Sequence, residues 1–401
     1  MAGLATEDSI VNSDKMFESN GINLFIGSAE SVDTNTRKVK LSDGSEIPYH
    51  KLILGMGSKP FIPPIENVGL EGVFTIRSLK DAENIKRFIQ SRSPKKMVFI
   101  GAGFISLEVA SLLLSSNPNH YDLSIIESLD YPLPLMLDND MASKVHEYLD
   151  DKGLKLRMSE KVTRILGNNG VVSGVELSSG EKLDADIIFL NVGALPNLKL
   201  ATDMGLEMGK YGIKVNEFLE TSNPDILAAG DCIENHHFIT RKPVSIQLRG
   251  PAVIQGRLMA KRLAGFDIPF TGLLGNSAVK LFDKYIGVTG LTDKQAREEG
   301  FDTVCSIVDS RNKHAMLSNV KSWTIKMVFD RQSQKLLGGQ ILSDDVAPVK
   351  EIDTVNALIL GEKTIPELAI LMCAGNPDCS SEPSAEPISI AAEQALQKLR
   401  K

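Results

Sequence analysis

The stretch that most constrains the fold is residues 97–110. An apolar run typical of a buried β-strand ends at Gly101, a tight turn follows, and from Phe104 the apolar residues recur at helical spacing. A second strand-like run, residues 123–126, ends in an acid, Glu127. A strand, a glycine turn, a helix and a second strand ending in an acid predict a βαβ unit that holds a dinucleotide.

Each position in this turn has a chemical reason. Gly101 permits the turn, and Gly103 lets backbone N–H groups approach a pyrophosphate, whose charge the start of the helix stabilises. Ser106 replaces the third glycine of the motif and is still small enough for close helix–strand packing. Glu127, 21 positions after Ser106, can accept a hydrogen bond from a ribose 2′-hydroxyl and would repel a 2′-phosphate. The motif therefore predicts that the site binds NADH rather than NADPH. The alternative to a dinucleotide-binding site is an ordinary parallel βαβ unit with a glycine-rich turn.

An internal repeat is the second strong signal. Residues 39–60 match residues 175–196 at a constant offset of 136 positions, with valine, leucine, serine, glycine and proline in register. This match predicts the duplication of a whole dinucleotide-binding domain. In the second copy, the glycine turn at Gly101 precedes Gly193 by 92 residues. Gly57 is the counterpart of Gly193, and a turn 92 residues before Gly57 would lie ahead of residue 1. We therefore expect the first copy to lack its βαβ unit. Three explanations are open: the chain is shortened at its N-terminus, the start codon is misplaced, or another polypeptide supplies the unit.

The bulk composition excludes several classes of function. The 401 residues are 42% hydrophobic and 24% charged, as in a soluble protein of two or three domains, and no apolar run is long enough for a transmembrane helix. A net charge of −7 argues against nucleic acid or an anionic membrane as partner. Four scattered cysteines without a C-x-x-C pair, and no signal peptide, predict a cytoplasmic protein. His236-His237 is the only histidine cluster, and no metal site is predicted.

The second half of the chain adds two features. An apolar strand from Asp225 ends in Gly230-Asp231, where an acid at the carboxyl end of a strand can bind a polyol hydroxyl, and residues 247–264 predict a helix that begins at Gly250-Pro251. From about residue 275, alternating strand patterns and then helical patterns predict an α+β domain on an antiparallel sheet.

Together these motifs resemble the FAD-dependent pyridine nucleotide-disulfide oxidoreductases, above all the branch of coenzyme A-disulfide reductases, NADH oxidases and NADH peroxidases. The resemblance covers nearly all 401 residues. It implies an α/β fold with two Rossmann-like, three-layer dinucleotide-binding domains and a C-terminal α+β dimerisation domain. The implied domains are FAD-binding for residues 1–80 and 206–274, NADH-binding for residues 81–205, and dimerisation for residues 275–401.

The resemblance also implies a function. A homodimer would pass hydride from NADH to FAD and on to an acceptor, which could be a disulfide such as coenzyme A disulfide, dioxygen or a peroxide. The alternative is a non-catalytic or incomplete nucleotide-binding subunit that needs a separate chain to bind FAD.

The same resemblance assigns the cofactor-binding residues. The residues implied for NADH are Gly101, Gly103, Phe104, Ile105, Ser106, Glu108, Glu127 and Gly193. Those implied for FAD are Gly57, Gly230, Asp231, Pro251 and Ala252. Asp231 would hold the ribityl chain, and the helix after Pro251 would direct its positive end at the flavin pyrimidine.

Two departures from the family pattern bear on the chemistry. The βαβ unit for the FAD pyrophosphate and the N-terminal redox cysteine have no counterpart, so the catalytic residues are not assigned. Cys379 is the one candidate, because its loop reaches the partner subunit's flavin in the family; a thiol there acts in redox chemistry or is inert. Cys232, Cys305 and Cys373 are predicted to be packing residues.

Overall fold

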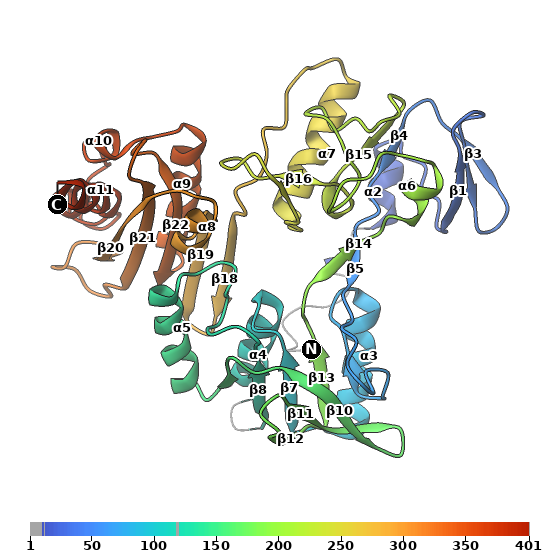
Figure 1. Cartoon of the computed structure of the whole chain (residues 1–401), viewed down its shortest axis with the longest axis horizontal. Helices are drawn as coiled ribbons and strands as arrows, with labels where there is room; N and C mark the ends of the chain where they lie inside the picture. The colour runs from blue at the N-terminus through green and yellow to red at the C-terminus, as the bar shows by residue number, and fades with distance from the viewer. Residues whose placement is uncertain (1–9, 12, 118–119, 401) are drawn as a thin grey trace. The chain divides into compact units, whose positions relative to one another are not determined.

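The structure, a computed structural model, describes residues 10–11, 13–117 and 120–400 (Figure 1). The chain divides into two compact units. Unit 1 comprises residues 1–59, 194–237 and 241–273, and unit 2 comprises residues 60–193, 238–240 and 274–401. In the described part of the chain, no helix is both long and apolar enough to cross a membrane.

A parallel sheet with the predicted βαβ unit at its centre organises the first part of unit 2. Its order is β6-β13-β7-β8-β9, formed by Val73–Phe74, Ile187–Leu190, Lys96–Ile100, Asp122–Ile126 and Lys155–Arg157. Three helices accompany it, namely α3 (Leu79–Arg92), α4 (Phe104–Ser116) and α5 (Asn139–Asp151). An antiparallel sheet follows, made of β10 (Val162–Asn168), β11 (Val171–Leu177) and β12 (Lys182–Asp184).

The central strand β7 is buried on both faces, which produces three layers. Met97 and Phe99 pack in one core with residues of α3, α4 and α5, whereas Val98 and Ile100 pack in another core with residues of β10 and β11. Alternating side chains of one strand thus contact helices on one side and a second sheet on the other. A continuous apolar run is the expected sequence pattern for such a strand.

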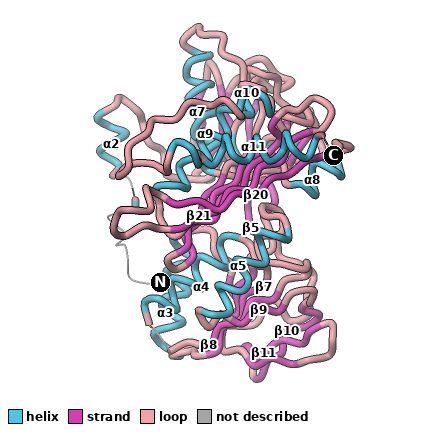
Figure 2. Tube along the Cα trace, turned by 90° about the vertical axis from the view of Figure 1, so that its left-hand side faces the viewer, coloured by secondary structure: helices cyan, strands magenta, loops and turns pink. Residues whose placement is uncertain are grey.

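The C-terminal part of unit 2 is built on a five-stranded antiparallel sheet. Its order is β18-β19-β22-β21-β20, formed by Ser277–Leu281, Lys284–Gly290, Leu336–Ser343, Ser322–Asp330 and Thr303–Arg311. The helices are α8 (Asp293–Glu298), α9 (Glu351–Leu360), α10 (Ile365–Leu368) and α11 (Pro387–Leu399), with short 3₁₀ turns at Ala347–Lys350 (η2) and Pro383–Ala385 (η3). Figure 2 shows α11 lying along β20 and β21, and residues of α9 and α11 share one apolar core with this sheet.

Unit 1 has smaller sheets. The hairpin strands β1 (Ala29–Asp33), β2 (Lys38–Leu41) and β3 (Glu46–Pro48) form one, and β4 (Leu52–Leu54) pairs in parallel with β15 (Ile226–Ala228). Two further pairs are β5 (Ser58–Pro60) with β14 (Ala194–Pro196), and β16 (Asn235–His236) with β17 (Pro243–Val244). The helices are α2 (Asp14–Ser19), α6 (Lys199–Asp203), the 3₁₀ turn η1 (Gly230–Cys232) and α7 (Arg249–Leu263).

Three expectations differ from the structure. Residues 22–26, which read as a strand, pair with no strand among the described residues. Helix α7 begins at Arg249, so Pro251 is its third residue rather than its first; its missing N–H still costs no helical bond, because first-turn N–H groups have no intrahelical acceptor. Strand β20 and helix α8 were not among the expected elements, although α8 carries a complete capping box at Thr292.

Candidate functional site

The turn after β7 has the geometry that a phosphate loop needs. Gly101 has a φ of +98°, and a Cβ added there would lie 2.6 Å from the carbonyl oxygen of Asn191, so only glycine fits. Gly103 is the N-cap of α4 and gives this helix no side-chain cap. A Cβ at Gly103 would meet no atom within 4 Å, so the space in front of the helix is open. The uncapped N–H groups of α4 can therefore bind an anion.

Glu127 is fixed to this turn by hydrogen bonds. Its Oε2 accepts from the backbone N–H of Ala102 at 2.8 Å, and its Oε1 accepts from the N–H of Leu129 at 3.0 Å and from the Ser128 hydroxyl at 3.2 Å. Each carboxylate oxygen has two lone pairs, so Glu127 keeps acceptor capacity for a hydroxyl. The structure thus brings the acid and the glycine turn together at the carboxyl ends of β7 and β8.

The other residues implied for NADH fall into three groups. Ser106 is fully buried and its hydroxyl accepts from Asn191 Nδ2 at 3.2 Å, so it packs the helix rather than facing a ligand. Phe104 packs against the helix-side core, while Ile105 and Glu108 are exposed. Gly193 follows β13, a strand that pairs in parallel with β7, and is exposed.

The residues implied for the flavin lie together within unit 1. The Ser58 hydroxyl, next to Gly57, donates to Asp231 Oδ2 at 2.7 Å. The N–H of Gly230 donates to Gln255 of α7 at 2.8 Å, and a Cβ at Gly230 would lie 3.5 Å from the Cβ of Ala252. Gly57 and Gly230 follow the parallel strands β4 and β15, and therefore lie at the carboxyl ends of this strand pair, close to the first turn of α7.

Comparison with known proteins decides the family. The family model described as pyridine nucleotide-disulphide oxidoreductase matches residues 4–256, more than half of the chain. The chain belongs to the pyridine nucleotide-disulphide oxidoreductase family. The dimerisation domain of the same family matches residues 277–386. The predicted family, the Rossmann-like α/β fold class, the flavin-dependent enzyme class and the cofactors FAD and NAD(H) are confirmed.

Individual relatives span most of the chain. It is 34% identical to an NADH oxidase of Methanocaldococcus jannaschii over 92% of its own length and 81% of the relative. It is 31% identical to a CoA-dependent NAD(P)H sulfur oxidoreductase of Pyrococcus furiosus, over 89% of its length and 80% of the relative. A solved NAD-dependent persulfide reductase from A. fulgidus superimposes with a TM-score of 0.92 at 29% identity, covering 99% of this chain and 74% of that one.

The flavoprotein family raises the question of whether unit 1 fits FAD. At the flavin end it does: helix α7 has no side-chain cap, and just before it the Nε2 of Gln247 is buried without a hydrogen-bond partner. At the pyrophosphate end it does not, because the described residues of unit 1 contain no glycine turn between a parallel strand and a helix. The described residues of unit 1 therefore fit the flavin end of FAD and do not fit its pyrophosphate.

Two of the cysteines in this oxidoreductase are unsuited to redox chemistry. Cys232 is fully buried, its thiol donates to the carbonyl oxygen of Ala229, and burial raises its pKa. Burial also raises the pKa of Cys305 to about 12. Both remain thiols at neutral pH. Cys373 and Cys379 are exposed, so the prediction that Cys373 packs in a core is wrong.

Cys379 is the one cysteine proposed as a catalytic candidate from the sequence. Of its two alternatives, we expect that its thiol is inert. Its backbone N–H, rather than its thiol, donates to the carbonyl oxygen of Asn376 at 3.1 Å, so serine preserves the loop. Cys379→Ser should leave NADH-dependent turnover unchanged, with Cys373→Ser as the matched exposed control. A loss of turnover confined to Cys379→Ser would place this thiol in the path of the electrons.

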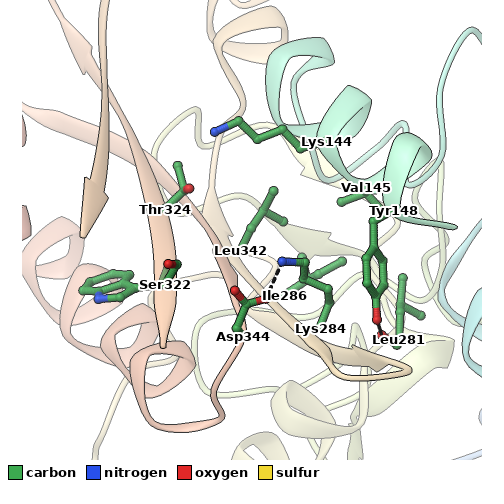
Figure 3. A pocket seen from close by; sticks show the side chains of 11 residues that line it. Lys144, Val145, Tyr148, Leu281, Lys284, Ile286, Ser322, Thr324, Leu342 and Asp344 are labelled. Atoms are coloured by element: carbon green, nitrogen blue, oxygen red, sulfur yellow. Dashed lines mark hydrogen bonds and ion pairs between the residues drawn. The ribbon is translucent and has the colours of Figure 1, made fainter. Parts of the chain in front are cut away.

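A cavity of about 120 Å³ lies elsewhere in unit 2, between α5 and the C-terminal sheet (Figure 3). Its charged side chains are paired: Lys284 with Asp344, and Lys144 Nζ at 3.5 Å from Asp309 Oδ1. Sites for small molecules enclose roughly 300–1,000 Å³. The cavity is too small for a dinucleotide, and none of the predicted site residues lines it.

Proposed function

We propose that this chain binds NADH at the glycine turn after β7. The pyrophosphate would lie against the first N–H groups of α4, and the adenosine ribose would donate a hydroxyl hydrogen to Glu127. Gly101 and Gly103 allow the backbone to approach the phosphates, and Gly193 borders the same edge of the sheet.

One observation carries this proposal: Glu127 is hydrogen-bonded to the turn itself, through the N–H of Ala102. In an ordinary βαβ unit the acid after the second strand has no reason to contact the turn after the first. Here the contact fixes a negative charge beside the space that a ribose would occupy. A 2′-phosphate would meet that charge, which favours NADH over NADPH.

The electrons of NADH would go to FAD, which accepts hydride and passes electrons to an acceptor when it is bound. The family relatives support two acceptor classes, sulfur compounds and dioxygen, because they include a CoA-dependent sulfur oxidoreductase and NADH oxidases. We further infer a homodimer, from the dimerisation domain at residues 277–386. The scattered cysteines support a reducing, cytoplasmic location.

A second candidate is a nucleotide-binding subunit that needs another polypeptide to hold FAD. The observation that favours it is that the described residues of unit 1 hold no glycine turn between a parallel strand and a helix. Absorbance of the purified chain separates the two candidates: a yellow protein that NADH bleaches is a complete flavoenzyme, and a colourless protein that binds NADH is the subunit.

Glu127→Arg tests the nucleotide site. We expect NADH to bind about 10- to 100-fold more weakly, because a hydrogen bond to a charged group is worth about 1.5–3 kcal/mol. NADPH should bind more tightly than before, because arginine attracts its 2′-phosphate. Calorimetric titration with both nucleotides gives the two dissociation constants.

Asp151→Arg is the matched control, since it makes the same change in charge at an exposed position, the last residue of α5. It should leave both dissociation constants unchanged. An unaltered preference in Glu127→Arg would show that Glu127 does not reach the ribose.

A further inference from the structure

The cavity between α5 and the C-terminal sheet of unit 2 has an apolar floor. Four buried side chains from α5, β18, β19 and β22 form this floor: Val145, Leu281, Ile286 and Leu342. Apolar walls offer water no hydrogen-bond partner, and an apolar cavity of about 150 Å³ in a protein stays dry and binds benzene. The cavity of about 120 Å³ is close to that volume. The floor therefore suits an apolar group about the size of one six-membered ring better than it suits water.

Positive charge lies where this cavity opens to water. Its charged lining residues are two lysines, Lys144 and Lys284, and one aspartate, Asp344, so the lining carries a net charge of 2 − 1 = +1. Lys284 pairs with Asp344, and Lys144 Nζ lies 3.5 Å from Oδ1 of Asp309, which does not line the cavity. The Lys144 and Lys284 side chains are 47% and 34% exposed (Figure 3). Because an ammonium group has three N–H donors, each lysine can bind a further anion beside its aspartate.

Tyr148 supplies an aromatic wall that is already held in place. Its hydroxyl donates to the Asp283 carboxylate and accepts from the N–H of Asp283 at 3.2 Å. Burial and the hydrogen bond to the carboxylate raise the pKa of Tyr148, so the phenol is neutral at neutral pH and adds no negative charge to the wall. Lys284 Nζ lies 5.4 Å from the centroid of the ring. A wall that is fixed before binding reduces the entropy cost of ordering the site around a ligand.

We propose that this cavity binds a small monocarboxylate whose apolar body is about the size of one six-membered ring. The body would lie on Val145, Ile286 and Leu342, and the carboxylate would accept hydrogen bonds from the ammonium groups of Lys144 and Lys284. None of the residues assigned to NADH or FAD lines the cavity, so the site does not depend on the proposed function. Because α5 and the C-terminal sheet both contribute walls, a bound carboxylate would also stabilise their packing.

Three probes of nearly the same shape test the proposal on the full chain: the anion benzoate, the neutral benzamide and the cation benzamidine. We expect one benzoate to bind per chain with a dissociation constant on the order of 1 mM, since so small a ligand makes few contacts. Benzamide should bind about tenfold more weakly, and benzamidine more weakly still, because the lining carries a net positive charge. In an NMR titration, the methyl resonances of Val145, Ile286 and Leu342 should shift as benzoate binds, which locates the probe in this cavity.

Lys284→Met should weaken benzoate binding about tenfold and leave benzamide binding unchanged, because methionine removes the charge and keeps an apolar stem. Lys363→Met is the matched control and should change neither, since Lys363 is a half-exposed lysine of the same unit, paired with Glu367 at 2.9 Å. Val145→Phe should prevent the binding of all three probes by filling the floor.

Three results would overturn the proposal. The first is the absence of saturable benzoate binding up to tens of millimolar, and the second is equal affinity for the three probes or for benzoate in Lys284→Met and the parent. The third is displacement of benzoate by NADH, which would place the probe in the nucleotide site instead.

Discussion

Gly101→Val is expected to weaken NADH binding about 100-fold or more. A side chain at a φ of +98° strains the backbone by about 1–3 kcal/mol, and its Cβ would lie 2.6 Å from the carbonyl oxygen of Asn191. That carbonyl cannot move freely, since the N–H of Asn191 is bonded to Ile100 at 3.0 Å. The turn must shift instead, and the N–H groups proposed to bind the pyrophosphate would shift with it. Titration of the purified variant with NADH measures the loss.

Gly153→Val is the matched control. Gly153 also has a positive φ, of +84°, but a Cβ there would meet no atom within 4 Å. Valine at position 153 would strain the backbone as valine at position 101 does, but it would not displace the turn after β7. NADH affinity should therefore stay close to that of the parent. Equal NADH affinity in Gly101→Val and the parent, with both folded by circular dichroism, would refute the role of this turn.

Lys326→Met is expected to lower the free energy of unfolding by about 3–5 kcal/mol. The Lys326 side chain is 4% exposed, and its Nζ lies 2.7 Å from Asp140 Oδ2 and 3.0 Å from Asp138 Oδ2. Burial alone would lower its pKa, but the hydrogen bond to Asp140 and the charge of Asp138 raise the pKa above 10.5, so the ammonium is charged at neutral pH. Methionine would leave the Asp138 carboxylate buried without its cation.

The other contacts of the Asp138 carboxylate indicate that the cluster of Lys326, Asp138 and Asp140 has a structural role. It accepts from Gln340 Nε2 at 2.6 Å and from the N–H groups of Asp293 and Lys294 at the start of α8. It therefore ties the entry of α5 to the C-terminal sheet of the same unit. Equilibrium denaturation with urea gives the change in stability.

Two further variants sharpen this experiment. Adding Asp138→Asn to Lys326→Met should recover part of the lost stability, because the buried charge is then removed with its partner. Lys38→Met, in an exposed pair with Glu46, should change stability by about 1 kcal/mol or less. A Lys326→Met protein as stable as the Lys38→Met protein would contradict the account of the cluster.

Local patterns predicted the elements that local chemistry determines. The glycine turn at Gly101 and the helix from Phe104 formed where the residues indicated, because turn residues act on their own neighbours. The place of Glu127 directly after β8 also followed from the sequence, whereas its hydrogen bond to the turn did not.

Features that depend on partners far away in the chain could not be predicted from the sequence. Residues 22–26 have the composition of a strand, but a strand forms only beside another strand. Lys326 meets Asp138 across 188 positions of sequence, and nothing in a single sequence links them. Ser106, in contrast, was predicted from the motif to allow close helix–strand packing, and it is fully buried and hydrogen-bonded to Asn191.

A structure determined with NADH bound tests the central claim most directly. We expect the pyrophosphate against the first N–H groups of α4 and a ribose hydroxyl within hydrogen-bond distance of Glu127. Nucleotide bound elsewhere, or a turn after β7 that stays filled by protein side chains at saturating NADH, would contradict it.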